Sequence, residues 1–88
     1  MSHTLARLRG VKLEMIGSIL KRDAPEHVKD GLHLEHLWQN DDDPDEVLFL
    51  FRTDDLNQAR QFIDRVHSQA RKENPDTNLP QMTFLKEQ

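Results

Sequence analysis

The sequence predicts one α+β domain over residues 1–88, with the element order strand, helix, strand, strand, helix, strand. Two stretches of apolar residues at three- and four-residue spacing predict the helices, and shorter apolar or alternating runs between them predict strands. The third observation is an unbroken apolar run at residues 47–51. Because strand side chains alternate between the two faces of a sheet, this run predicts a strand that buries both faces.

Size and composition limit the classes of protein to consider. The chain has 88 residues and a formal net charge of -4, which opposes attraction to phosphate backbones, so no nucleic acid partner is expected. It has no cysteine, which excludes disulfides, thiolate metal ligands and cysteine nucleophiles. No apolar run is long enough for a membrane span or a signal peptide, so we expect no membrane partner and a cytoplasmic location.

The first two predicted elements are the least regular. Residues 4–9 are half polar and predict a short strand. Apolar positions then recur at helical spacing, but Pro25 interrupts them, so we expect a helix over residues 12–22 and then a kink or a second short helix to Asp30. Apolar residues also alternate over 11–15, and periodicity alone leaves a strand open there.

A hairpin is predicted next. Gly31 can end the helix, because glycine readily adopts the left-handed backbone found after helices. Residues 32–39 predict a strand and, if that strand is regular, its even-numbered residues share the more apolar face. A turn over Asn40–Glu46, rich in aspartate and containing a proline, then leads into Val47–Phe51.

The last helix and strand complete the order. Residues 53–55 supply capping side chains before the clearest helical stripe of the chain, Asn74-Pro75 ends that helix, and residues 81–85 predict the last strand. The resulting β-α-β-β-α-β order is the ferredoxin-like arrangement, a four-stranded antiparallel sheet with both helices on one face. The other face inherits half of the apolar run at 47–51, so a second copy of the chain is the expected cover.

Several segments together carry a resemblance to a known family. They are His3-Thr4-Leu5 with Arg7, Gly31 before a strand ending in Asp42-Asp43-Pro44, the apolar strand, Asp54-Asp55-Leu56 leading to Ala59-Arg60-Gln61-Phe62, and Pro80-Gln81-Met82-Thr83-Phe84-Leu85. In their order and spacing the chain resembles small ferredoxin-like proteins of the dimeric α/β-barrel superfamily, which also contains antibiotic-biosynthesis monooxygenase-like and cyclase-like proteins. The resemblance covers nearly the whole chain. It implies a homodimer whose two sheets form a barrel, and a pocket between each sheet and its helices.

Three side chains are candidates for binding or chemistry. His36 can shuttle protons or contact a ligand, because imidazole titrates near neutral pH, although a partly buried hydrogen-bonded histidine is the simpler interpretation. Trp38 can stack on a flat ligand, or it can belong to the core or an interface. Arg7 can orient an anionic group, or form a salt bridge across the sheet or the dimer. His33 and His36 are three residues apart, so a regular strand places them on opposite faces and they share no metal.

The remaining polar clusters predict no site. The acidic residues at 41–46 lack the spacing of a calcium loop and predict a solvated turn. The three other histidines, His3, His27 and His67, are too scattered in sequence to predict a site, and we expect neither a metal nor a cofactor. Residues 1–22 are mainly basic and residues 41–55 mainly acidic, so we expect the two segments to attract one another, within the fold or across the dimer.

The sequence therefore favours a homodimeric module that binds a small ligand or a partner. The alternative is a cofactor-independent enzyme, monooxygenase-like or cyclase-like, acting on a hydrophobic or aromatic small molecule with His36 as acid or base and Arg7 and Trp38 as binding residues. A cavity of roughly 300 Å³ lined by His36 and Trp38 would favour the enzyme, whereas filling of that space by Leu20, Phe62 and Val66 would oppose it. The predicted dimer interface consists of Val47, Leu48, Phe49, Leu50 and Phe51.

Overall fold

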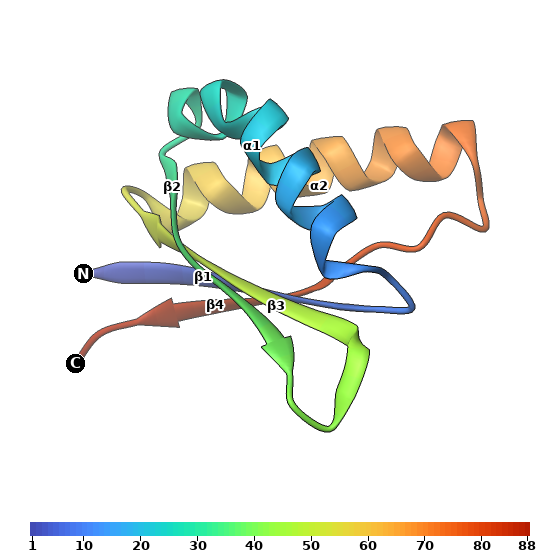
Figure 1. Ribbon diagram of the computed structural model, residues 1–88. Coiled ribbons are helices and arrows are strands. Elements are labelled where there is room, and N and C mark those ends of the chain that lie inside the picture. Colours follow the sequence, from blue (N-terminus) through green and yellow to red (C-terminus); the bar gives the residue numbers. More distant parts are fainter.

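The predicted order of strands and helices is present in the computed structural model, which describes all residues from 1 to 88. The elements are β1 (Ser2–Arg9), α1 (Leu13–Lys29), β2 (Leu32–Asn40), β3 (Asp43–Thr53), α2 (Leu56–Glu73) and β4 (Gln81–Lys86). The strands form one antiparallel sheet in the order β2-β3-β1-β4, and both helices cover the same face of it (Figure 1). The α+β ferredoxin-like prediction is therefore confirmed.

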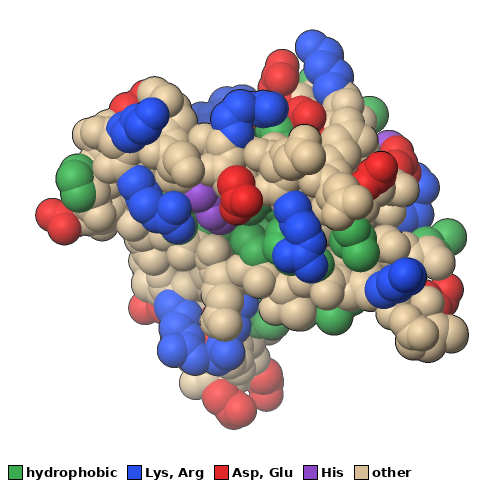
Figure 2. Space-filling view, turned by 180° about the vertical axis from the view of Figure 1, so that it is seen from behind, with side chains coloured by type: hydrophobic (Ala, Val, Ile, Leu, Met, Phe, Trp, Pro, Cys, Tyr) green, Lys and Arg blue, Asp and Glu red, His purple; other side chains and the backbone are tan.

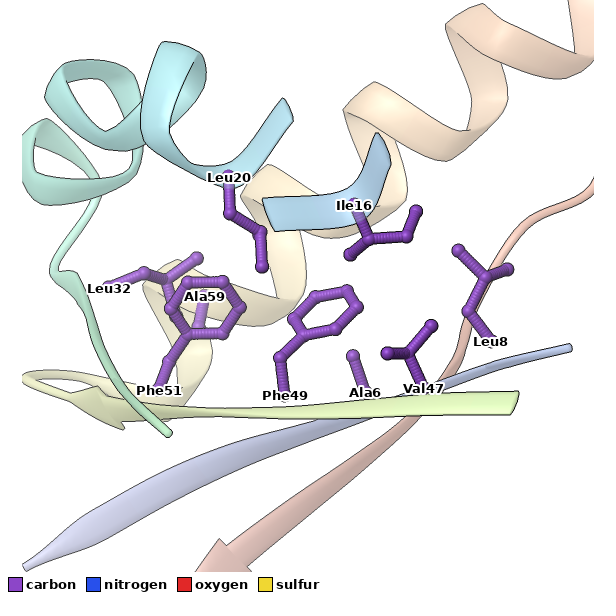
Figure 3. Packing of buried hydrophobic residues seen from close by; sticks show 9 residues of the cluster. All are labelled: Ala6, Leu8, Ile16, Leu20, Leu32, Val47, Phe49, Phe51 and Ala59. Carbon is purple, nitrogen blue, oxygen red and sulfur yellow. The ribbon is translucent and has the colours of Figure 1, made fainter. Parts of the chain in front are cut away.

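The apolar run at 47–51 lies in β3, which is longer than the run itself and occupies the interior of the sheet beside β1. Val47, Phe49 and Phe51 point toward the helices and are buried in the core (Figure 3). Leu48 and Leu50 alternate to the other side, here called the open face, where they are half-buried. One subunit thus buries only one side of the run completely.

Helix α1 differs from the sequence prediction, because it continues through Pro25 as a single element from Leu13 to Lys29. A proline removes one backbone donor from a helix, and packing can outweigh that loss. Beyond Pro25, the ring of His27 lies edge-on against Phe51 and Phe62, at centroid distances of 5.3 and 6.1 Å. These contacts hold the last turns on the sheet, and the alternative of a strand over residues 11–15 is wrong.

The end of α1 follows the prediction for Gly31. This glycine has a left-handed backbone with φ of 77°. A Cβ atom added there would lie 3.2 Å from the Cβ atom of Asp54, closer than ordinary van der Waals contact. Both the backbone angle and the close approach of Asp54 therefore favour glycine at the junction of α1 and β2.

Strand β2 is not regular, so the predicted faces are wrong beyond Leu34. A β-bulge shifts the register between Leu34, opposite Phe51, and His36, opposite Leu50. The extra residue, Glu35, has no partner on β3. Because of this added residue, His33 and His36 both lie on the open face rather than on opposite faces.

The hairpin between β2 and β3 is tighter than predicted. Asn40 pairs with Asp43, so only Asp41 and Asp42 form the turn. The side chain of Asn40 accepts a hydrogen bond from the backbone N–H of Asp42, and that of Asp43 accepts one from Asp45. Such local bonds explain why Asn and Asp residues suit this reversal.

Helix α2 begins and ends where the sequence predicts. Asp55 caps it by accepting hydrogen bonds from the backbone N–H groups of Asn57 and Gln58, and Asn74 follows its last residue. Neither α1 nor α2 has the combination of length and apolar character that crossing a membrane requires.

Candidate functional site

A mostly apolar cavity lies between the two helices and the sheet. Its volume is about 260 Å³, and 12 of its 16 lining residues are hydrophobic. Phe49 and Phe51 of β3 belong to its lining, with Pro80 and Met82 contributed by the chain around the start of β4. The helices contribute the apolar residues Ile16, Ile19, Leu20, Phe62, Ile63 and Val66. The site is therefore an apolar chamber on the helix-covered side.

Aromatic rings along this cavity meet edge to face. Phe49 and Phe51 have centroids 5.7 Å apart with an interplanar angle of 86°. His27 continues the series against Phe51 and Phe62 at angles of 76° and 83°. Edge-to-face contacts favour particular ring orientations, which apolar burial alone does not. These rings therefore form a wall of defined shape along the cavity.

Only Asp23, His27 and His67 bring ionisable groups to the lining. Burial lowers the pKa of His27, although Asp23 nearby acts in the opposite direction. Burial also lowers the pKa of His67, and the positive charge of Arg71 adds to this effect. Both imidazoles are therefore uncharged at neutral pH, and each has a donor and an acceptor nitrogen.

The side opposite to that of Figure 1 is shown in Figure 2, where hydrophobic side chains gather in the middle of the surface between charged ones. Arg60 of α2 forms a cation–π contact with Phe84 of β4, with its guanidinium carbon 4.1 Å from the ring centroid. Val66, which lines the cavity, is 44% exposed. The apolar chamber thus reaches the surface along α2.

The predicted candidates His36 and Trp38 lie elsewhere, on the open face. Their rings stack with centroids 4.9 Å apart and an interplanar angle of 14°, and Trp38 is 45% exposed. Neither residue lines the cavity between the helices and the sheet, whereas Leu20, Phe62 and Val66 all do. The cavity condition on which the enzyme interpretation depended is therefore not met at His36 and Trp38.

Arg7 also lies on the open face, in a polar cluster around Glu46. The Nε atoms of Arg7 and Arg9 both donate to Oε2 of Glu46, at 3.0 and 2.6 Å, and Asn40 donates to Oε1 at 2.8 Å. The Glu46 side chain is only 4% exposed. Hydrogen bonds from Arg9, Asn40 and Arg7 lower its pKa to about 2. Together with the Lys12–Asp45 pair, this confirms that the basic and acidic segments attract one another within the fold.

A hollow of about 410 Å³ lies beside this cluster on the open face. Arg7 and Glu46 line it together with Leu5, Leu48 and Thr83. The salt bridge offered as the simpler interpretation of Arg7 is therefore present within one subunit, beside the hollow that Arg7 helps to line.

A second polar network lies on the open face at the other end of β3. His3 Nε2 lies 3.2 Å from Glu35 Oε1, and His33 Nε2 lies 3.0 Å from Asp54 Oδ2. Arg52 joins the two carboxylates through contacts of 3.9 and 3.6 Å. The hydrogen bond with His33 lowers the pKa of Asp54. No three histidine, aspartate or glutamate side chains converge closely enough to hold a metal ion.

From the sequence, His3, His27 and His67 are too scattered to predict a site, but α1 and α2 bring two of them, His27 and His67, to the lining of one cavity. The helical period offered a signal that the sequence analysis missed. His27 lies seven residues after the buried Leu20, and His67 four residues after the buried Ile63. Such spacings place each histidine on the core-facing side of its helix.

Comparison of the chain with family models, with curated proteins and with solved structures found no match. The ferredoxin-like assignment accordingly depends on element order and sheet topology. Membership of the dimeric α/β-barrel superfamily stays a prediction.

Proposed function

We propose that the protein is a homodimeric binding module that holds a small hydrophobic molecule in the cavity between its helices and its sheet. The observation that supports this proposal is the cavity of about 260 Å³ with its predominantly hydrophobic lining. Apolar cavities with a few polar groups are the usual form of small-molecule sites. The volume lies just below the range of about 300–1,000 Å³ typical of drug-sized ligands, so it suits a compact molecule.

The homodimer part of the proposal is supported by the open face. Half-buried Leu48 and Leu50 lie there beside the partly exposed Trp38, with Leu5 on the neighbouring β1. A sheet face with apolar side chains at its centre and ion pairs at both ends has the composition of an interface core with a polar rim. The helices cover Val47, Phe49 and Phe51, so these residues cannot contact a second subunit. Of the run at 47–51, the proposed interface therefore keeps only Leu48 and Leu50. A cytoplasmic location stays part of the proposal.

Reporters for the two surfaces are already separated in the chain. All of its isoleucines, Ile16, Ile19 and Ile63, line the cavity, whereas the single tryptophan, Trp38, lies on the open face. We expect para-nitrotoluene to change the methyl chemical shifts of the isoleucines, which NMR of isoleucine-labelled protein measures during a titration. The tryptophan emission should report the assembly state. If the isoleucine signals do not move at millimolar ligand, the binding proposal is wrong.

A pair of variants tests the location of the ligand. Val66→Phe adds a ring at the partly exposed wall of the cavity and should reduce the affinity for para-nitrotoluene about tenfold or more, since filling the site removes apolar contact area. Val28→Phe adds the same ring on α1 at a position that is 52% exposed and does not line the cavity. That control should bind like the wild type. Equal losses in both variants would contradict the assignment.

A further inference from the structure

We propose that the cavity selects electrically neutral aromatic molecules bearing a hydroxyl or similar hydrogen-bonding group, which His27 and His67 recognise, and that it discriminates against ionised ligands. This inference rests on the proposed binding function and narrows it to one chemical class. It follows from the shape of the aromatic wall, from the polar groups in the lining and from the charges around them.

The aromatic wall favours a ring. Phe49, Phe51, His27 and Phe62 form a continuous edge-to-face series along the cavity. A flat ligand ring can extend that series with an edge-to-face or offset contact, which an aliphatic chain of the same volume cannot make. The small volume, about 260 Å³, limits the ligand to a compact ring system.

The polar groups favour a neutral ligand. His27 and His67 resist protonation in this apolar setting, and as neutral imidazoles they can each donate and accept one hydrogen bond. A hydroxyl group, which also donates and accepts, matches them. The lining includes neither lysine nor arginine to neutralise a carboxylate or a phosphate.

The one carboxylate of the lining opposes ions of both signs. Asp23 gives an anionic ligand no positive partner, and its own charge is already matched by Arg22, whose Nε and Nη2 donate to Oδ1 and Oδ2 at 2.9 and 3.3 Å. A cationic ligand would have to displace that guanidinium. The ion pair therefore leaves the cavity with no unpaired charge to attract a ligand ion.

Charges on the surrounding elements do not alter this balance. On α1, Glu26 and Asp30 influence His27 with negative charge, and Asp30 lies 3.9 Å from Arg65 of α2. On α2, His67 is influenced by one group of each sign, Asp64 and Arg71. The lining residues from the sheet and from the chain before β4, such as Leu8, Phe49, Leu79 and Met82, have no ionisable side chain.

The open-face hollow provides an internal contrast. Arg7 and Glu46 line it, so it contains a guanidinium group that an anionic ligand can contact, which the cavity between the helices does not. An ionised aromatic molecule is expected to prefer whatever part of that hollow the partner subunit leaves uncovered, and a neutral one the cavity between the helices. The ionisation state of a bound probe therefore reveals which surface holds it.

The experiment uses para-nitrophenol, whose neutral and ionised forms absorb at different wavelengths, with para-nitrotoluene as the matched compound that lacks the hydroxyl group. We expect the wild-type protein to bind the neutral phenol at least about tenfold more tightly than the phenolate, which raises the apparent pKa of the bound probe by about one unit. Isoleucine methyl NMR locates the bound probe in the cavity.

Two variants test the polar recognition. His27→Phe keeps a ring but removes both nitrogens, so the affinity for neutral para-nitrophenol should fall about three- to tenfold, the range of one lost hydrogen bond, while that for para-nitrotoluene stays within about twofold. His67→Met should act in the same direction and serves if His27→Phe does not fold. His36→Phe, on the open face, is the matched control and should leave both affinities unchanged.

The outcomes separate the two proposals. Preference for the neutral phenol together with a selective loss in the cavity variants supports the inference. Tighter binding of the phenolate, or equal losses of both probes in His27→Phe and His67→Met, overturns it but leaves the hydrophobic binding function intact. Absence of binding by both probes overturns the proposed function and the inference with it.

Discussion

At the scale of single residues, the most distinctive group is the buried carboxylate of Glu46 beneath Arg7 and Arg9. Its folded pKa of about 2 lies below the ordinary value of 4.5, because Arg9, Asn40 and Arg7 donate to the ionised form. A carboxylate whose pKa is lowered by folding stabilises the folded protein at pH values above the pKa of the unfolded chain. This contribution is lost as the pH falls from about 4.5 toward 2.

We therefore predict that Glu46→Gln lowers the free energy of unfolding at pH 7 and that the difference from the wild type shrinks between about pH 4.5 and 2. Urea denaturation at a series of pH values measures both. Asp42→Asn, in the exposed hairpin turn, is the control and should stay close to the wild type throughout. A Glu46→Gln difference that does not change with pH would contradict the assigned role of the carboxylate.

His27 gives a second prediction, and its lowered pKa makes stability change with pH in the same direction as it does for Glu46. Burial lowers its folded pKa below the ordinary value of 6.5, so the unfolded chain binds a proton more readily and stability falls as the pH drops below about 6.5. His27→Phe removes this group. Its unfolding free energy relative to the wild type should therefore rise when the pH changes from 7.5 to 5, as measured by urea denaturation. The same pH dependence in both proteins would show that His27 does not contribute.

At the scale of elements, α2 depends on its first turn. Asp55 accepts two backbone hydrogen bonds, from Asn57 at 2.8 Å and from Gln58 at 3.2 Å. Asp55→Ala leaves these donors without their partner and should cost about 0.5–2 kcal/mol in unfolding free energy. Asp55→Asn keeps an oxygen acceptor and should recover most of that loss. Equal destabilisation by Ala and Asn in chemical denaturation would mean that the cap is not the cause.

The element scale also shows which features the sequence could predict. The cap and stripe of α2 are local patterns, so its limits were predictable. The bulge at Glu35 was not, because a single extra residue in a strand changes the faces without changing composition. The continuation of α1 through Pro25 was equally hidden, since it depends on contacts of His27 with Phe51 and Phe62, which are distant in sequence.

At the scale of the whole molecule, the candidate site was the least predictable part. His36 and Trp38 were the predicted ligand contacts, because an uninterrupted strand would present both to the pocket. The bulge places both on the open face, while the packing of α1 and α2 brings His27 and His67 to the lining of one cavity. The apolar run of β3 predicted a strand that buries both faces, whereas one subunit fully buries only Val47, Phe49 and Phe51, on the side covered by the helices.

The open face of the sheet allows a test of dimer assembly, because the adjacent residues Phe49 and Leu50 of β3 lie on opposite sides of the sheet. Phe49 is buried under the helices, so an aspartate there would be removed from water without a partner for its charge. We therefore expect Phe49→Asp to unfold the protein, which circular dichroism measures. Leu50 is half-buried on the open face, so Leu50→Asp should keep the fold but separate the subunits. Light scattering should then give the subunit mass of 10.4 kDa for this variant and about twice that for the wild type. A monomeric wild type, or a Leu50→Asp protein that remains dimeric, would contradict assembly through the open face.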